Sequence, residues 1–138
     1  MPNTFPKHNL ETAPEKSKPL LRQLLEQSGP NGFYSVTAES PETLTAYAML
    51  HKAFMASSFT NEEKTVIWQT INVENQCHFC VPAHTYMAKA MEIDKAVSDA
   101  LRNETALPTA RLEALRDFTL LMLRNHGNAS DAEVSKFL

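Results

Sequence analysis

Both cysteines of this chain and two of its histidines lie in a single short segment. The sequence Cys77-His78-Phe79-Cys80 is followed four residues later by His84. A helix that begins near Cys80 would put His84 one turn further on, on the same face as Cys80, close enough to exchange a proton with its thiol. Sulfurs at a helix start also lie near backbone amides that stabilise a thiolate. The pattern predicts redox chemistry in which one thiolate attacks and the second resolves the product as a disulfide.

Two other uses of these residues remain open. Cys77, Cys80 and His84 could supply three zinc ligands, with His51 or His126 as a distant fourth. Zinc is less favoured because the chain has no second CxxC and no paired histidine spacing. The cysteines could also be inert buried residues. Covalent haem attachment is excluded, since it needs a histidine directly after the second cysteine and this chain has Val81 there.

Composition narrows the class of protein. A chain of 138 residues is expected to form one domain, and its formal net charge of -3 gives no basic field for nucleic acid or anionic membranes. We find no apolar run of signal-peptide or membrane-spanning length, so we expect a cytoplasmic protein. In that reducing compartment a CxxC pair is more often catalytic, redox-sensing or metal-binding than a static bridge.

The sequence predicts that the segments around the thiols are helices. Only three glycines occur, and apolar residues recur at three- and four-residue spacing, which is typical of an all-α domain. We predict about six helices, plus a short or truncated one at the C-terminus. The predicted starts are near Pro14, after Ser40, after Thr60, around the CxxC (running to about Met91), after Asp94, after Pro108 (ending at Gly127) and after Ser130.

Three segments carry further local signals. The segment after Thr60 is rich in β-branched residues and would suit a strand, but Thr60 and Glu63 have the capping-box spacing that favours a helix. Gly29-Pro30-Asn31-Gly32 is predicted to be a loop, and residues 1–13 a mobile N-terminus. Pro82 is tolerated only in the first turn of a helix, so the helix of His84 must start close to the CxxC.

The motif and its surroundings resemble a known family. Cys77-x-x-Cys80-x-x-x-His84, preceded by a capped helix in residues 60–75, is similar to the alkylhydroperoxidase D-like (AhpD-like) branch of the carboxymuconolactone decarboxylase family. The resemblance covers about residues 15–125. Upstream it includes Leu25-Glu26, Gly29, Pro30-Asn31-Gly32-Phe33 and Ser40-Pro41-Glu42-Thr43-Leu44.

This resemblance implies an all-helical bundle that assembles as a trimer or hexamer with the active site near a subunit contact. It implies that Cys80 attacks the peroxide, Cys77 resolves and His84 relays a proton. No cofactor is expected beyond a redox-active Cys77–Cys80 disulfide. The implied partners are a hydroperoxide or disulfide substrate and a lipoylated or thioredoxin-like electron donor.

The chain departs from the family pattern at two positions. The family's usual acid lies twelve residues before the first cysteine, where this chain has Thr65. Glu62 and Glu63 are not clean replacements, and Glu74, three residues before Cys77, is our candidate for the missing carboxylate. Phe79 stands where the founding peroxidase has a histidine. The alternative function is a non-redox, decarboxylase-like or small-molecule-binding oligomer.

Overall fold

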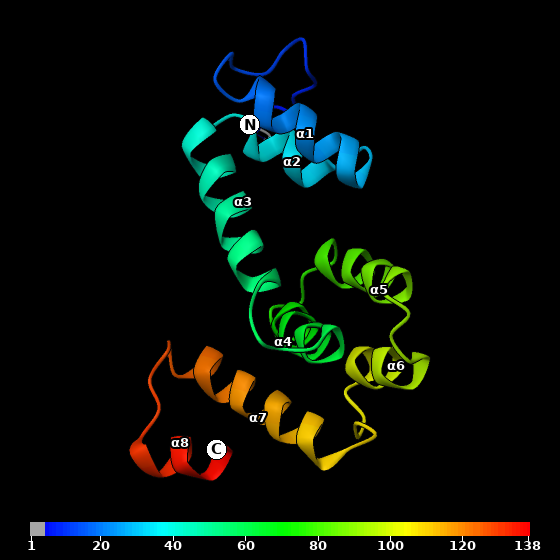
Figure 1. Ribbon diagram of the computed structural model, residues 1–138, viewed down its shortest axis with the longest axis vertical. Coiled ribbons are helices and arrows are strands. Elements are labelled where there is room, and N and C mark those ends of the chain that lie inside the picture. The colour runs from blue at the N-terminus through cyan, green and yellow to red at the C-terminus, as the bar shows by residue number, and fades with distance from the viewer. Residues whose placement is uncertain (1–4) are drawn as a thin grey trace. The chain divides into compact units, whose positions relative to one another are not determined.

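The computed structural model describes residues 5–138, which form helices and connecting loops without a strand (Figure 1). The all-α prediction is confirmed, but these residues contain eight helices rather than about six. None of them is long and apolar enough to cross a membrane. The helices are α1 (Lys18–Ser28), α2 (Gly32–Thr37), α3 (Pro41–Met55), α4 (Asn61–Glu74), α5 (Cys80–Ala90), α6 (Lys95–Asn103), α7 (Ala110–Arg124) and α8 (Asp131–Phe137).

Most helix starts follow from local capping. The Ser40 hydroxyl accepts a hydrogen bond from the Thr43 amide at the start of α3, and Asp94 caps α6 in the same way. Both predicted capping boxes are present, at Thr60 for α4 and at Ser130 for α8. The helical reading of α4 is therefore confirmed over the strand alternative.

The region between the first two predicted helices differs from expectation. The first helix begins at Lys18 rather than near Pro14. It ends at Ser28 and is followed by Gly29, whose φ of 74° lies in the left-handed region. The predicted loop 29–32 is shorter than expected because α2 begins at Gly32. Its cap is Asn31, whose side chain accepts a hydrogen bond from the Phe33 amide at 2.9 Å.

The structure divides into two compact units, one ending at Ser57 and the other comprising Ser58–Leu138. The predicted single-domain organisation stays a prediction. In the first unit, α1, α2 and α3 bury an apolar core that includes Leu21 and Leu44, both fully buried. A buried hydrogen bond of 2.7 Å from the Ser17 hydroxyl to the Ala38 carbonyl ties the start of α1 to the end of α2.

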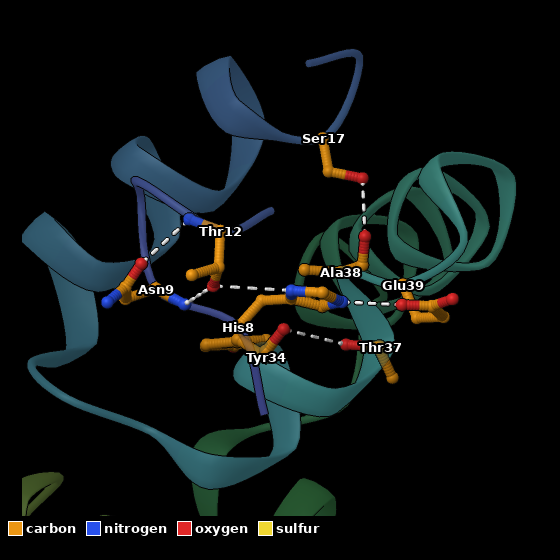
Figure 2. Close-up of polar contacts among 8 residues, drawn as sticks. All are labelled: His8, Asn9, Thr12, Ser17, Tyr34, Thr37, Ala38 and Glu39. Carbon is orange, nitrogen blue, oxygen red and sulfur yellow. Dashed lines mark hydrogen bonds and ion pairs between the residues drawn. The ribbon is translucent and has the colours of Figure 1, made fainter. Parts of the chain in front are cut away.

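The described part of the N-terminal segment packs on this first unit (Figure 2). His8 donates its backbone amide to the Ser35 carbonyl at 2.9 Å, and its Nε2 lies 2.5 Å from a carboxylate oxygen of Glu39. Ala13 is buried in the core. Hydrogen bonds and burial thus tie part of residues 5–13 to the first unit. The predicted mobility of residues 1–13 stays a prediction, and residues 1–4 lie outside the described part.

The second unit is built around α4, which packs against α5, α6 and α7. Its apolar core gathers one residue of α4 with residues of α6, α7 and the intervening loop: Val66, Val97, Ala100, Leu101, Leu107, Leu112 and Leu115. The first turn of α4 is also held by charge, because Arg111 of α7 donates from Nε to the Glu63 carboxylate at 2.8 Å. The helix that precedes the CxxC is therefore fixed on several sides.

Candidate active site

The connection from α4 to α5 is short and positions the CxxC. After α4 ends at Glu74, Gln76 takes a left-handed conformation with φ of 50° and turns the chain. The Cys77 amide then donates back to the Asn72 carbonyl at 3.0 Å, and the Val81 amide donates to the Cys77 carbonyl at 3.1 Å. The two cysteines therefore lie on either side of the start of α5, as the motif predicted.

The two sulfurs are bonded to each other. Cys77 and Cys80 form a disulfide with their Cα atoms 5.2 Å apart. The Cys80 backbone amide donates to the Cys77 sulfur at 3.1 Å. When the bond is reduced, this amide and the helix start would stabilise a thiolate on Cys77. Both cysteines are partly exposed, and the side chain of Phe79 between them is largely exposed, so a reactant in solvent can reach the pair.

His84 lies on α5, one turn beyond Cys80. Its ring is partly buried and meets the Trp68 indole edge to face, with 4.8 Å between the ring centroids. Trp68 belongs to α4 and is itself buried. Helix α4 therefore orients the histidine as well as the cysteine segment, a contribution of Trp68 that the sequence analysis missed.

A buried amide network joins the same two helices. Gln69 of α4 donates from Nε2 to the Val81 carbonyl at 3.0 Å and to the Thr85 hydroxyl at 3.1 Å. Its Oε1 accepts from Asn72 Nδ2 at 3.1 Å. The sequence analysis did not single out these residues. The available signal was a pair of amide side chains three residues apart within residues 66–73, where most of the other residues are apolar.

The hydrogen-bond partners of the candidate carboxylates Glu63 and Glu74 lie outside α5. Both oxygens of Glu74 accept from Arg124 of α7, at 2.7 and 2.9 Å. These hydrogen bonds from Arg124 lower the pKa of the Glu74 carboxyl below its ordinary value. Glu63 is bonded to Thr60 and Arg111. Thr65, at the position of the family's acid, donates its hydroxyl to the Asn61 carbonyl within α4 at 2.8 Å.

The residues considered for zinc do not form a metal centre in residues 5–138. Within this range no three histidine, cysteine, aspartate or glutamate side chains are arranged to hold an ion. Cys77 and Cys80 have their sulfurs in the disulfide, and His126 lies just beyond the end of α7 with a left-handed φ of 53°.

Comparison with known proteins adds a likeness in fold. No family model and no curated protein sequence matches the chain. Its structure is similar to the crystal structure of the alkylhydroperoxidase AhpD core, an uncharacterized peroxidase-related protein from Ralstonia eutropha JMP134. The two are 22% identical with a TM-score of 0.82, over 96% of this chain and 73% of that one. The chain has the AhpD-like fold.

The AhpD-like fold agrees with what the Cys77–His84 motif implied about architecture. In this chain the capped helix α4 lies directly before the CxxC, and α5 begins at the second cysteine. A likeness in fold does not test the reaction roles of Cys80, Cys77 and His84, which stay predictions.

Proposed function

We propose that this chain belongs to the AhpD-like proteins and is a thiol-dependent peroxidase or disulfide oxidoreductase that works in the cytoplasm as a homo-oligomer. One observation carries the proposal: Cys77 and Cys80 are joined in a disulfide at the start of α5, with His84 one turn further on. A pair that is partly exposed and lies at a helix start has the features of a redox-active disulfide.

The proposed reaction begins with the reduced pair. His84 takes the proton of the Cys80 thiol, and the thiolate attacks the outer oxygen of a hydroperoxide. The O–O bond breaks, Cys80 becomes a sulfenic acid and the alkoxide takes up a proton to leave as an alcohol. The Cys77 thiolate then attacks the Cys80 sulfur, the S–O bond breaks, and hydroxide leaves with a proton as water. Two electrons from the pair have reduced the peroxide.

A dithiol donor, such as a lipoylated or thioredoxin-like protein, would close the cycle. One donor thiolate attacks the disulfide, and its second thiolate displaces the protein from the mixed disulfide. Both protein thiols are regenerated while the donor becomes a disulfide. The amide of Cys80 favours Cys77 as the leaving thiolate in the first exchange, because it already donates to the Cys77 sulfur.

The relay that we propose assigns the proton to His84 and leaves out the carboxylates considered from the sequence. Our sequence candidate, Glu74, has both oxygens on Arg124, so the proposed steps do not include it. A family-type acid is also absent at Thr65.

Stopped-flow oxidation of the reduced protein tests the proposal. Cumene hydroperoxide is mixed with wild type, Cys80→Ser and His84→Gln, and thiol loss is followed. We expect wild type to form the disulfide, Cys80→Ser to stay reduced, and His84→Gln to react at least about a hundredfold more slowly. Wild-type oxidation no faster than that of Cys80→Ser would overturn the peroxidase proposal.

The disulfide oxidoreductase part is tested separately. The oxidised protein is mixed with dihydrolipoamide. The appearance of thiols on Cys77 and Cys80 is then measured by alkylation and mass spectrometry. We expect reduction at a rate well above that of an exposed model disulfide such as oxidised glutathione. A rate no higher than the model's would remove this part of the proposal.

A further inference from the structure

Two residues of α4 hold the two ends of the cysteine segment, Asn72 by its backbone carbonyl and Gln69 by its side-chain amide. Asn72 accepts the Cys77 amide on its backbone carbonyl at 3.0 Å, and its side chain donates to Gln69 Oε1 at 3.1 Å. Gln69 in turn donates to the Val81 carbonyl at 3.0 Å. We call Gln69 and Asn72 the amide bracket. Residues 77–81, which contain both sulfurs, are thus tied to α4 at their first and last positions.

The orientation of the bracket follows from the groups that it meets. The Val81 carbonyl can only accept, so the Gln69 NH₂ group must face α5. The Thr85 hydroxyl donates to that same carbonyl at 2.7 Å and is therefore an acceptor for the second Gln69 N–H. The remaining polar atom of Gln69, Oε1, accepts a hydrogen bond from Asn72 Nδ2. Every hydrogen-bonding atom of this amide thus has a partner.

Gln69 is an unusual residue for this place. It is 1% exposed, and burying an amide costs free energy unless its hydrogen bonds are made. A leucine or methionine would fill a similar volume without that cost. A fully bonded buried amide contributes a defined geometry that an apolar contact does not, because its bonds are directional.

We propose that the amide bracket is a positioning device for the redox pair: it fixes the first turn of α5 relative to α4 so that the Cys77 and Cys80 sulfurs meet. The bracket acts on the sulfurs through the backbone of residues 77–81: the Gln69 side chain bonds the Val81 carbonyl, and the Asn72 side chain orients Gln69. The proposal rests on the proposed function for the role of the disulfide, although its effect on disulfide formation can be measured without any peroxide.

The measurable quantity is the equilibrium between dithiol and disulfide. In a dithiothreitol redox buffer the protein pair gives two electrons and two protons to oxidised dithiothreitol, and one S–S bond forms as another breaks. If the bracket holds the sulfurs together, its loss lowers the equilibrium constant for closing the disulfide. For Gln69→Leu we expect a fall of about tenfold, which for a two-electron couple is about 30 mV towards a more oxidising potential.

The structure offers a matched control on the same helix. Thr65 lies one turn before Gln69, is equally buried, and bonds the Asn61 carbonyl within α4 rather than α5. Thr65→Val therefore perturbs the interior of α4 but leaves the bracket intact. A second pair of variants changes the α5 side of the same contact. Thr85→Val removes the hydroxyl that accepts a hydrogen bond from Gln69, whereas Thr85→Ser keeps it.

The variants of the 138-residue chain are equilibrated with dithiothreitol and alkylated, and their masses are measured. Their stability to urea is measured in parallel. We expect Gln69→Leu to shift the redox equilibrium about tenfold, Thr85→Val about threefold, and Thr65→Val and Thr85→Ser less than about twofold, even where urea stability falls. Equal shifts in Gln69→Leu and Thr65→Val, or no shift in Gln69→Leu, would overturn the proposal. Should Gln69→Leu fail to fold, equal equilibria in Thr85→Val and Thr85→Ser would overturn it.

The outcomes separate this inference from the proposed function. If wild type does not react with peroxide but Gln69→Leu shifts the dithiol–disulfide equilibrium, the peroxidase proposal is refuted and the bracket proposal is supported. A wild type that reduces peroxide, together with an unshifted Gln69→Leu equilibrium, supports the peroxidase and refutes the bracket.

Discussion

Replacing Glu63 with glutamine tests how the helix before the active site is anchored. The Glu63 carboxylate accepts the Thr60 amide at 2.9 Å in the capping box, and its other oxygen accepts from Arg111 at 2.8 Å. The side chain is 8% exposed, whereas that of Arg111 is 81% exposed. Glutamine keeps the size and one acceptor oxygen but removes the charge. The variant therefore weakens both contacts without creating a cavity.

The expected loss of stability can be worked from these contacts. A hydrogen bond to a charged group contributes about 1.5–3 kcal/mol net, compared with about 1 kcal/mol for a neutral one, so the Thr60 contact loses about 1 kcal/mol. An ion pair whose cation is in water adds roughly 0.2–1 kcal/mol. We therefore expect Glu63→Gln to lower the free energy of unfolding by about 1–2 kcal/mol at neutral pH.

The same loss should depend on pH in a definite direction. The hydrogen bond from the Thr60 amide, together with that from Arg111, lowers the pKa of the Glu63 carboxyl in the folded protein. The charged form thus stabilises the fold at any pH well above the ordinary glutamate pKa of about 4.3. This contribution disappears as the pH falls through the lower folded-state pKa. Wild type and variant should converge in stability as the pH is lowered from 7 towards 3.

Urea unfolding followed by circular dichroism measures both effects. A loss of 1–2 kcal/mol moves the urea midpoint by roughly 0.5–1 M for a chain of this size. The matched control is Glu62→Gln, which removes a charge from the same first turn and should cost less than about 0.5 kcal/mol. Equal losses in the two variants, or a Glu63→Gln loss that stays constant from pH 7 to pH 3, would refute the reasoning.

Three further predictions concern the core, a helix end and the unused carboxylate. Val66→Ala removes two carbons from a fully buried side chain and should cost about 2–3 kcal/mol by urea unfolding; a loss below 1 kcal/mol would contradict the core assignment. Glu104→Gly relieves a left-handed φ of 54° and should raise the unfolding free energy by about 0.5–1 kcal/mol, with a decrease as the contrary result. Glu74→Gln and Arg124→Gln should each leave peroxide-dependent thiol loss within about twofold of wild type, because each carboxylate oxygen is held by the guanidinium. A tenfold fall in Glu74→Gln alone would return Glu74 to the proton relay.

Helix starts were readable in the sequence because their signals are local. Thr60 and Glu63 bond each other across three residues, and Ser40 bonds the Thr43 amide over the same span. Such contacts need no tertiary structure, so the residue types alone predict them. The short α2 escaped prediction because Gly32 and Pro30 indicate a loop more strongly than Asn31 indicates a cap.

Helix ends were harder to predict for a physical reason. The chain has only three glycines, and left-handed residues at or just after helix ends include Gln76, Glu92, Glu104 and His126. A non-glycine residue accepts this conformation only when surrounding contacts compensate its cost. Those contacts come from the packed structure, so nothing in the residue types marks these positions.

Local spacing also predicted part of the candidate site, whereas tertiary packing determines the rest. Cys77, Cys80 and His84 could be brought together from spacing alone, because all three lie at or near one helix start. Gln69 and Trp68 reach the site only through the packing of α4 on α5, and from sequence they read as ordinary members of a mixed helix. The partner of Glu74 is fifty residues away on α7, a distance over which sequence spacing carries no information.

Trapping the sulfenic acid tests the central claim most directly. In Cys77→Ser the resolving thiol is absent, so a peroxide-attacking Cys80 should stop at the sulfenic acid, which dimedone labels. One equivalent of cumene hydroperoxide is added to the reduced variant with dimedone present, and the labelled residue is identified by peptide mass spectrometry. The account predicts a single dimedone adduct on Cys80 that is lost in the matched variant carrying His84→Gln at the same reaction time. An unlabelled Cys80 in a reduced, folded Cys77→Ser protein would contradict it.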